Sequence, residues 1–273
     1  MVQEDRRNAY FSMWASPSRP GAGFFVGDEL STSARQRRYF PLPQWRALDA
    51  ETQAVALAAQ AAWEEVASVA AEVEWPAAEL APHPLIDWFT PTVSNETPAR
   101  DVMERQALHL LHARSALVLT GSSPSAFVDL LEALATAVTG SSQAVRSAPI
   151  ATDPDAGGVR IVFPPSDTLH GRLGRLHHYI RHSEGPTVMA AAVALVAITN
   201  AHPFIDGNGR SGRVLFNLVM NRDQRHLGAV AIPLHAIGNR PPGNLTLYMR
   251  GAELRGDWGS LLNFLFKAIT SGR

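Results

Sequence analysis

The sequence predicts a mostly α-helical fold with one β-hairpin, and a largely helical extension in front of the main domain. Three observations carry this prediction. After residue 97, apolar residues recur at three- and four-residue spacing, which is typical of amphipathic helices. The one convincing pair of strands flanks the turn-rich segment ATDPDAGG, within residues 145–163. Of the 273 residues, 46% are hydrophobic and 18% are charged, a composition typical of a chain that buries a core.

Residues 1–95 are expected to form the extension and residues 96–273 the main domain. The extension begins irregularly, because its first stretches are rich in turn-forming residues and have no sustained period. Asp49 is then expected to cap a long Ala-rich helix that ends near Trp75. Several prolines from Pro76 onward favour an extended linker between that helix and the main domain.

In the main domain the helical period recurs along most of the chain. Helices are expected over about 97–119, 124–139, 169–180, 187–201, 210–222, 244–258 and 260–269. Ser123 and Gly140 are suitable caps for the second of these helices. Gly171 and Gly174 weaken the pattern of the third. Two consecutive prolines, Pro164 and Pro165, are expected to end the hairpin.

Composition excludes several classes of function. A formal net charge of −1 gives no global basic field for nucleic acid or an anionic membrane. The absence of cysteine removes disulfides, thiolate nucleophiles and thiolate metal sites, as is compatible with a reducing cytoplasm, the expected location. The first residues lack a signal-peptide layout, and the longest apolar run, Val188–Ile198, is too short to span a bilayer. Export by a dedicated secretion machine would leave no sign in the sequence.

The stretch AHPFIDGNGRSGR, residues 201–213, directly follows the most apolar of the expected helices. Pro203 prevents that helix from continuing, so His202 lies at its C-terminal end. Gly207 and Gly209 permit positive φ angles, which aim successive backbone N–H groups into one concavity at the start of the next helix. The stretch is therefore expected to bind an anion.

The charged residues of this stretch suit a polyphosphate that carries a cation. Arg210 and Arg213 are three residues apart, so both lie on one face of the helix and can bind phosphate. Asp206 is a suitable ligand for a hard cation that bridges phosphates. His202 is within reach to remove a proton from an attacking hydroxyl. Taken singly, each residue also has a plain interpretation as a turn, a helix stop or a surface charge, but their uninterrupted order favours a site.

In this order the residues resemble the motif of the Fic family, His-x-Phe-x-Asp/Glu-Gly-Asn-Gly-Arg-x-x-Arg. Every fixed position is filled, by His202, Phe204, Asp206, Gly207, Asn208, Gly209, Arg210 and Arg213. The resemblance extends over roughly residues 97–270. A hairpin flap that ends in an aromatic-Pro-Pro element precedes the motif in the family, as Phe163-Pro164-Pro165 does here. After the motif, the family usually has an Asn, a Tyr four residues later and then a Gly-Asp pair before a last helix. The residues here that look like these positions are Asn244, Tyr248, Gly256 and Asp257.

The resemblance implies a Fic-type helical core and a nucleotidyltransferase, a protein adenylyltransferase that performs AMPylation with ATP as co-substrate and Mg²⁺ as cofactor. His202 would deprotonate a Ser, Thr or Tyr hydroxyl of a target protein, which would then attack the α-phosphate. Asp206 would hold Mg²⁺. The phosphates would be bound by Gly207, Asn208, Gly209, Arg210 and Arg213. Asn244 and Tyr248 would line the adenine pocket. The flap at 145–163 would dock the target protein by backbone pairing.

Many members of the family are inhibited by a glutamate, in the pattern Ser/Thr-x-x-x-Glu-Gly/Asn, that pairs with the second motif arginine. Thr92 and Glu96 have this spacing and lie just before the core. Thr97 departs from the pattern, and Pro98 does not suit a continuing helix, so a plain loop with a solvated Glu96 is the other interpretation. A separate antitoxin, as in a toxin–antitoxin pair, is the alternative source of inhibition.

Other functions stay open at this point. Gly209 stands where the kinase branch of the family carries Lys, which favours nucleotidyl transfer. On the same fold, removal of AMP (a deAMPylase) would use Glu96 to position water, and relatives also transfer UMP or phosphocholine. An alternative of another class is a non-catalytic nucleotide-binding interaction protein, although such a protein would not need His202 as a base.

Overall fold

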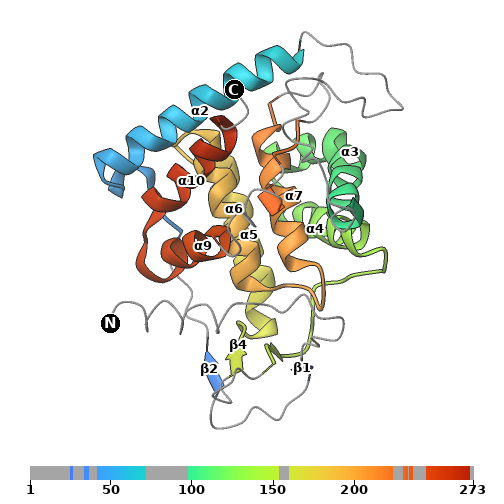
Figure 1. Cartoon of the computed structure of the whole chain (residues 1–273). Coiled ribbons are helices and arrows are strands. Elements are labelled where there is room, and N and C mark those ends of the chain that lie inside the picture. The colour runs from blue at the N-terminus through green and yellow to red at the C-terminus, as the bar shows by residue number, and fades with distance from the viewer. Residues whose placement is uncertain are drawn as a thin grey trace.

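A computed structural model describes residues 25–26, 34–36, 42–71, 98–153, 160–223, 230–232, 234–235 and 244–270. The fold is mostly α-helical with one small sheet, as the sequence predicts (Figure 1). The described helices are α2 (Ala50–Ala71), α3 (Pro98–Thr120), α4 (Pro124–Thr139), α5 (Leu169–His182), α6 (Thr187–Ala201), α7 (Asn208–Met220), α9 (Asn244–Arg255) and α10 (Trp258–Thr270), with short 3₁₀ helices η1 (Trp45–Ala47) and η3 (Ser166–Thr168).

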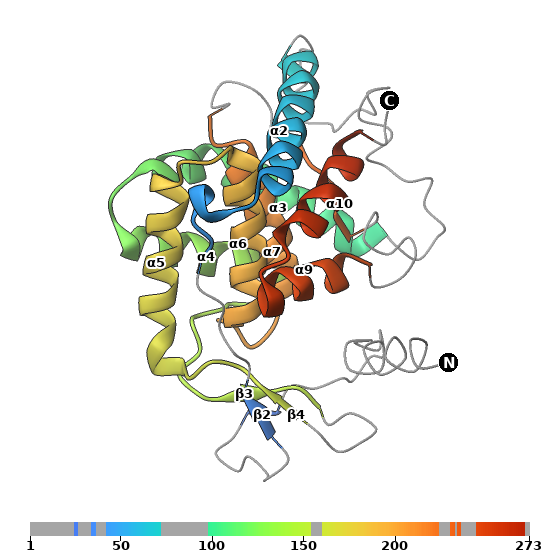
Figure 2. The ribbon, with the colours of Figure 1, turned by 90° about the vertical axis from the view of Figure 1, so that its left-hand side faces the viewer.

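Helix α6 lies at the centre of the helical body, and nearly all of its residues are buried (Figures 1 and 2). Its run of small residues lets neighbouring helices approach closely. Helix α7 packs along it, where a Cβ added to Gly212 would lie 3.3 Å from Leu195. Because the loop between α6 and α7 joins two closely packed helices, both of its ends are held firmly.

Local sequence signals explain where α4 and α5 begin and end. The Ser123 hydroxyl accepts a hydrogen bond from the Ala126 amide at 3.2 Å, and Gly140 ends α4 with a φ of 71°. Helix α5 forms despite Gly171 and Gly174, because its leucines and Ile180 bury one face against the core.

Helix α2, which belongs to the predicted extension, packs into the same core as the main domain. Asp49 caps it as predicted, since its carboxylate accepts from the Thr52 amide at 2.7 Å and from the Thr52 hydroxyl at 2.8 Å. Trp63 is buried, and α2 lies along α10 (Figure 1). Gln60 accepts a hydrogen bond from the Val188 amide at the start of α6, at 3.0 Å. The predicted boundary near residue 95 lies outside the described residues.

The predicted hairpin is present, and two strands from the extension lengthen its sheet. β3 (Ile150–Ala151) and β4 (Arg160–Val162) pair antiparallel, with Ala151 opposite Val162. β1 (Phe25–Val26) pairs antiparallel with β3, and β2 (Ala34–Gln36) pairs parallel with β4, which gives the order β1-β3-β4-β2. Strands of two or three residues leave no periodic pattern, which is why the sequence predicted no strand in this part of the extension.

The described helices include none that is both long and apolar enough to cross a bilayer. The apolar run in α6 is instead buried within the protein.

Candidate active site between helices α6 and α7

His202 ends α6 in a left-handed backbone conformation, with φ 49° and ψ 58°. Among the described residues it is the one non-glycine with a positive φ. Such a conformation costs an L-residue about 1–2 kcal/mol, so the surrounding structure must hold it. The His202 amide still donates to Ile198 O at 2.9 Å, which ties the residue to the last turn of the helix.

The imidazole of His202 is oriented by contacts on two sides. Nδ1 lies 3.3 Å from Thr199 O, and because a carbonyl oxygen can only accept, Nδ1 carries the proton in this contact. The lone pair of the neutral ring is then on Nε2, as a general base requires. The Phe163 ring, at the end of the flap, stacks on the imidazole with a centroid distance of 3.8 Å and an interplanar angle of 19°. The structure therefore brings the predicted base and the predicted flap element together.

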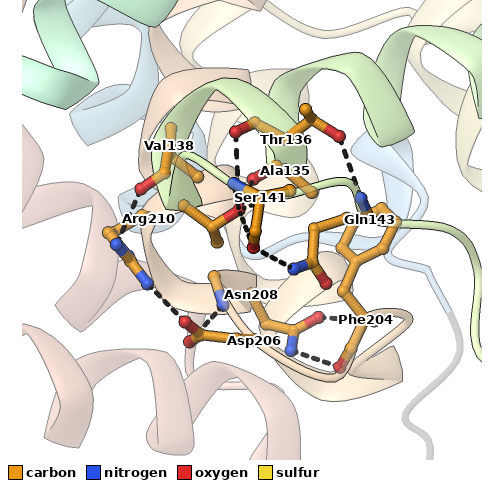
Figure 3. A network of polar contacts seen from close by, with 11 residues as sticks. Ala135, Thr136, Val138, Ser141, Gln143, Phe204, Asp206, Asn208 and Arg210 are labelled. Atoms are coloured by element: carbon orange, nitrogen blue, oxygen red, sulfur yellow. Dashed lines mark hydrogen bonds and ion pairs between the residues drawn. The ribbon is translucent and has the colours of Figure 1, made fainter.

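The loop after His202 is held in shape by Asn208. Its Oδ1 accepts from the Phe204 amide at 2.9 Å, and its Nδ2 donates to Phe204 O at 2.8 Å (Figure 3). Both Asn208 and Phe204 are buried. The side chain of Asn208 is thus used within the loop, so its contribution to an anion site would come from its backbone amide at the start of α7.

The two glycines of the loop differ in their backbone. Gly207 has a φ of 83°, and a Cβ added there would lie 2.6 Å from Thr139 Cγ2, so the expectation of a positive φ is right. For Gly209 it is wrong, because this residue already lies in the first turn of α7 and has helical geometry. The N–H groups of a first turn have no partners within the helix and carry its partial positive charge, so this end of α7 still suits an anion.

Asp206, just before α7, forms an ion pair with Arg210 in the first turn of that helix. Arg210 Nη2 lies 2.9 Å from Asp206 Oδ2, and Arg210 Nη1 donates to Val138 O, at the end of α4, at 2.6 Å (Figure 3). Asp206 Oδ1 accepts from the Gly207 amide at 2.5 Å. The Asp206 side chain is 61% exposed, so its carboxylate remains accessible to a ligand from solvent.

Arg213 points to α3, where it meets Glu104. Arg213 Nε lies 3.1 Å from both carboxylate oxygens, and Nη2 contacts Oε1 as well. The side chains are only 15% and 13% exposed. The two guanidinium groups therefore point to different partners, Arg210 to Asp206 and Arg213 to Glu104. No sequence pattern marks Glu104, because Arg100 and Arg105 stand where the inhibitory pattern has Ser/Thr and Gly/Asn.

The acidic groups fit a metal ion that arrives with phosphates, and they do not form a cage of their own. Within the described ranges, no cluster of three or more His, Asp or Glu side chains is placed to hold a metal. Mg²⁺ commonly binds to proteins through one or two carboxylates, with phosphate oxygens and water as its other ligands. The accessible carboxylate of Asp206 fits that role.

Other predicted site residues are placed only in part. Asn244 is the first residue of α9, and its side chain lies outside the described residues. Tyr248 is half-buried against Phe264 of α10, with ring centroids 5.3 Å apart. Thr92 and Glu96 lie outside the described residues, so the proposed inhibitory role of Glu96 stays a prediction.

Two buried polar groups behind the loop were not found from the sequence. Arg146, between α4 and β3, donates to His202 O through Nε at 2.8 Å. Glu253 of α9 accepts from Asn200 in the last turn of α6 and pairs with Arg250. No motif marks these residues, and burial of a charged side chain is the property that distinguishes them.

The comparison with protein families supplies the remaining observation. The model of the Fic/DOC family matches residues 124–220, from the start of α4 to the end of α7. The chain carries a Fic domain. A Fido domain-containing protein of Dictyostelium discoideum is 39% identical over 66 residues, which make up 23% of this chain and 46% of that protein. The chain thus matches less than half the length of this relative.

Solved Fic structures share the fold. A Fic family protein from Desulfovibrio desulfuricans G20 superposes with a TM-score of 0.50 and 15% identity, over 81% of this chain and 63% of the other. A fragment of Fic-1 from C. elegans gives a TM-score of 0.50 and 16% identity, over 80% and 71%. At these identities the likeness concerns the fold alone.

Proposed function

We propose that this Fic domain protein transfers the adenylyl group of ATP to a hydroxyl side chain of a target protein. One observation carries the proposal. A histidine whose Nδ1 lies against a backbone carbonyl, an accessible carboxylate, two arginines and a helix N-terminus all belong to the loop between α6 and α7 and to the helix that follows it. These are the groups that an in-line attack on a nucleotide phosphate requires.

In the proposed reaction, His202 Nε2 accepts the proton of the target hydroxyl while its oxygen attacks the α-phosphorus of ATP. A new P–O bond joins AMP to the target. The bond between the α-phosphorus and the bridging oxygen breaks, and its electron pair leaves with pyrophosphate. The first turn of α7, together with Arg210 and Arg213, would stabilise the phosphate charge. Mg²⁺, held at Asp206, would neutralise part of the same charge.

The ion pair between Arg213 and Glu104 makes autoinhibition part of the proposal. A phosphate can bind Arg213 through Nε and Nη2 only if it replaces the Glu104 carboxylate, because the bidentate contact occupies both of these donor groups. Glu104 lies in α3, which precedes the loop in sequence and packs against α7. Among the described residues, Glu104 thus makes the contact for which the sequence suggested Glu96.

The target protein is proposed to dock on the flap by backbone pairing. In the structure both edges of the hairpin are already paired, β3 with β1 and β4 with β2. A target strand would therefore have to replace β1 or β2 before it could pair. The Phe163–His202 stack places the end of β4 next to the proposed base.

Intact-mass spectrometry of the purified protein with Mg²⁺ and ATP, alone and with total cell protein as acceptor, tests this function. An adduct of one AMP is expected, stronger in Glu104→Gln and absent in His202→Ala. An adduct that forms only from UTP or CDP-choline would assign a different transferred group. Loss of AMP from modified protein would favour the reverse reaction. Nucleotide binding without any adduct would leave the non-catalytic interpretation.

A further inference from the structure

Arg146 is a buried cation whose hydrogen bonds all go to backbone carbonyl oxygens. It is 4% exposed, and in the described part of the chain no carboxylate pairs with it. Burial lowers the pKa of its guanidinium to about 10, so the side chain still carries its charge at neutral pH. A buried charge without a counter-ion is unfavourable, so its retention calls for a specific role.

The carbonyls that Arg146 binds belong to three separate segments. Nε donates to His202 O at 2.8 Å, and Nη2 lies 3.4 Å from Ala201 O, at the C-terminal end of α6. Nη2 also donates to Pro164 O at the end of the flap, at 2.5 Å. Nη1 donates to Ala148 O at 2.9 Å, on the approach to β3. A single planar fork thus joins the end of α6 to both sides of the flap.

These contacts surround the strained residue. The backbone amide of Arg146 donates to Pro203 O at 2.8 Å, while its side chain holds the carbonyl of His202. The two peptide groups that follow the His202 Cα are therefore both fixed by one residue. A cation at this place also complements the negative end of the α6 dipole and satisfies carbonyls that have no partner within the helix.

We propose that Arg146 is a positioning residue that holds His202 in its left-handed conformation and couples it to the flap. The same guanidinium fixes Pro164, which directly follows the Phe163 ring on the imidazole. The imidazole and the aromatic ring that covers it are thereby aligned through one side chain. This inference rests on the proposed function, because it concerns how the proposed base is aimed at the target hydroxyl.

Arg222 provides a matched control. It is another largely buried arginine that ties helix ends together, with Nη1 donating to Ile180 O at 2.7 Å and Nη2 to Thr187 Oγ1 at 3.3 Å. Within the described part of the chain, its contacts are with Asp223, Ile180 and Thr187, and none of these residues belongs to the loop after α6. Replacing Arg222 with Met therefore removes a comparable helix contact without altering the support of His202.

The test compares Arg146→Met, Arg146→Lys and Arg222→Met in transfer kinetics. Arg146→Met is expected to lower kcat about 100-fold with little change in the KM for ATP, because a misplaced base slows chemistry and leaves nucleotide binding intact. Arg146→Lys keeps the charge but not the fork, and about a tenfold loss is expected. Arg222→Met is expected to keep the kcat of the wild type. A folded Arg146→Met protein with wild-type kcat, or an equal loss in Arg222→Met, would overturn the proposal.

A second measurement separates this inference from the proposed function. In protein labelled at histidine, the NMR signals of His202 are expected to shift in Arg146→Met, and the amides of Arg160 to Val162 to exchange faster with solvent. Neither change is expected in Arg222→Met. If no variant transfers any group, these signals still decide about Arg146, and unchanged signals in Arg146→Met would refute its role.

Discussion

Glu104→Gln is the substitution that bears most directly on how the site is controlled. In the wild type, a phosphate that binds Nε and Nη2 of Arg213 must first displace a bidentate carboxylate. Glutamine has nearly the same shape but no charge and only one acceptor oxygen, so the bidentate contact is lost and a single hydrogen bond from the guanidinium to the amide oxygen remains. The variant is therefore expected to bind Mg-ATP more tightly and to transfer the adenylyl group faster than the wild type.

The magnitude follows from the geometry of the pair. A hydrogen bond to a charged group contributes roughly 1.5–3 kcal/mol, and the substitution removes one of the two contacts that Arg213 makes through Nε and Nη2. The competition is thus weakened by about 2 kcal/mol, which corresponds to roughly 30-fold tighter binding of Mg-ATP. The same pair stabilises the protein without nucleotide, so the free energy of unfolding is expected to fall by about 1–2 kcal/mol. Lower stability together with tighter binding is the signature of an inhibitory contact.

Isothermal titration calorimetry with Mg-ATP measures the affinity without a target protein, and urea unfolding measures the stability. Glu184→Gln is the matched control, because Glu184 forms an exposed ion pair with Arg46 at 2.7 Å and precedes α6, whose opposite end carries the motif. Exposed pairs contribute little, so both quantities should stay at wild-type values. If folded Glu104→Gln binds Mg-ATP no more tightly than the wild type, Glu104 is structural and the reasoning fails.

Three further outcomes are expected. Gly207→Ala should lower the free energy of unfolding by about 2 kcal/mol, because its Cβ would lie 2.6 Å from Thr139 Cγ2 at a positive φ; Gly209→Ala, in an ordinary helical turn, should not. Burial lowers the pKa of His177, so the unfolded chain takes up a proton before the folded one as the pH falls below about 6.5. This histidine should then lower the free energy of unfolding by at most about 1.4 kcal/mol per pH unit. The decline with falling pH should be smaller in His177→Leu, which lacks the titrating group. Arg35→Pro should remove β2 from the flap and speed amide exchange in β4.

Each of these expectations has a result that would contradict it. Equal urea stability of Gly207→Ala and Gly209→Ala would show that the loop adapts to a side chain. The same loss of stability between pH 7.5 and 5.5 in wild type and His177→Leu would remove this histidine as a cause. Wild-type hydrogen exchange of residues 160–162 in Arg35→Pro would mean that β2 does not protect the flap.

The loop between α6 and α7 was predictable because its determinants are contiguous. Pro203 stops a helix, Gly207 permits the positive φ, and the apolar run before them fixes where the helix must end. The same local reasoning was wrong about the backbone of Gly209, since a glycine that can adopt a positive φ need not do so. It also did not foresee that both polar atoms of the Asn208 side chain are hydrogen-bonded to the backbone of Phe204.

Contacts over long separations in sequence were not predictable. Glu104 precedes its partner Arg213 by 109 residues, and Arg146 precedes His202 by 56. Neither separation is one that a helix or a turn would impose, so a single sequence does not indicate that these residues are paired. Their partners follow from how α3 packs on α7 and how the segment between α4 and β3 meets the end of α6, which are properties of the assembled fold.

Transfer from ATP labelled at either the α- or the γ-phosphate tests the central claim most directly. With Glu104→Gln as enzyme and total cell protein as acceptor, label from the α-phosphate should appear on protein, and label from the γ-phosphate should be released in pyrophosphate. His202→Ala should abolish the α-label. Protein label from the γ-phosphate, or an α-label that persists in His202→Ala, would contradict adenylyl transfer by this loop.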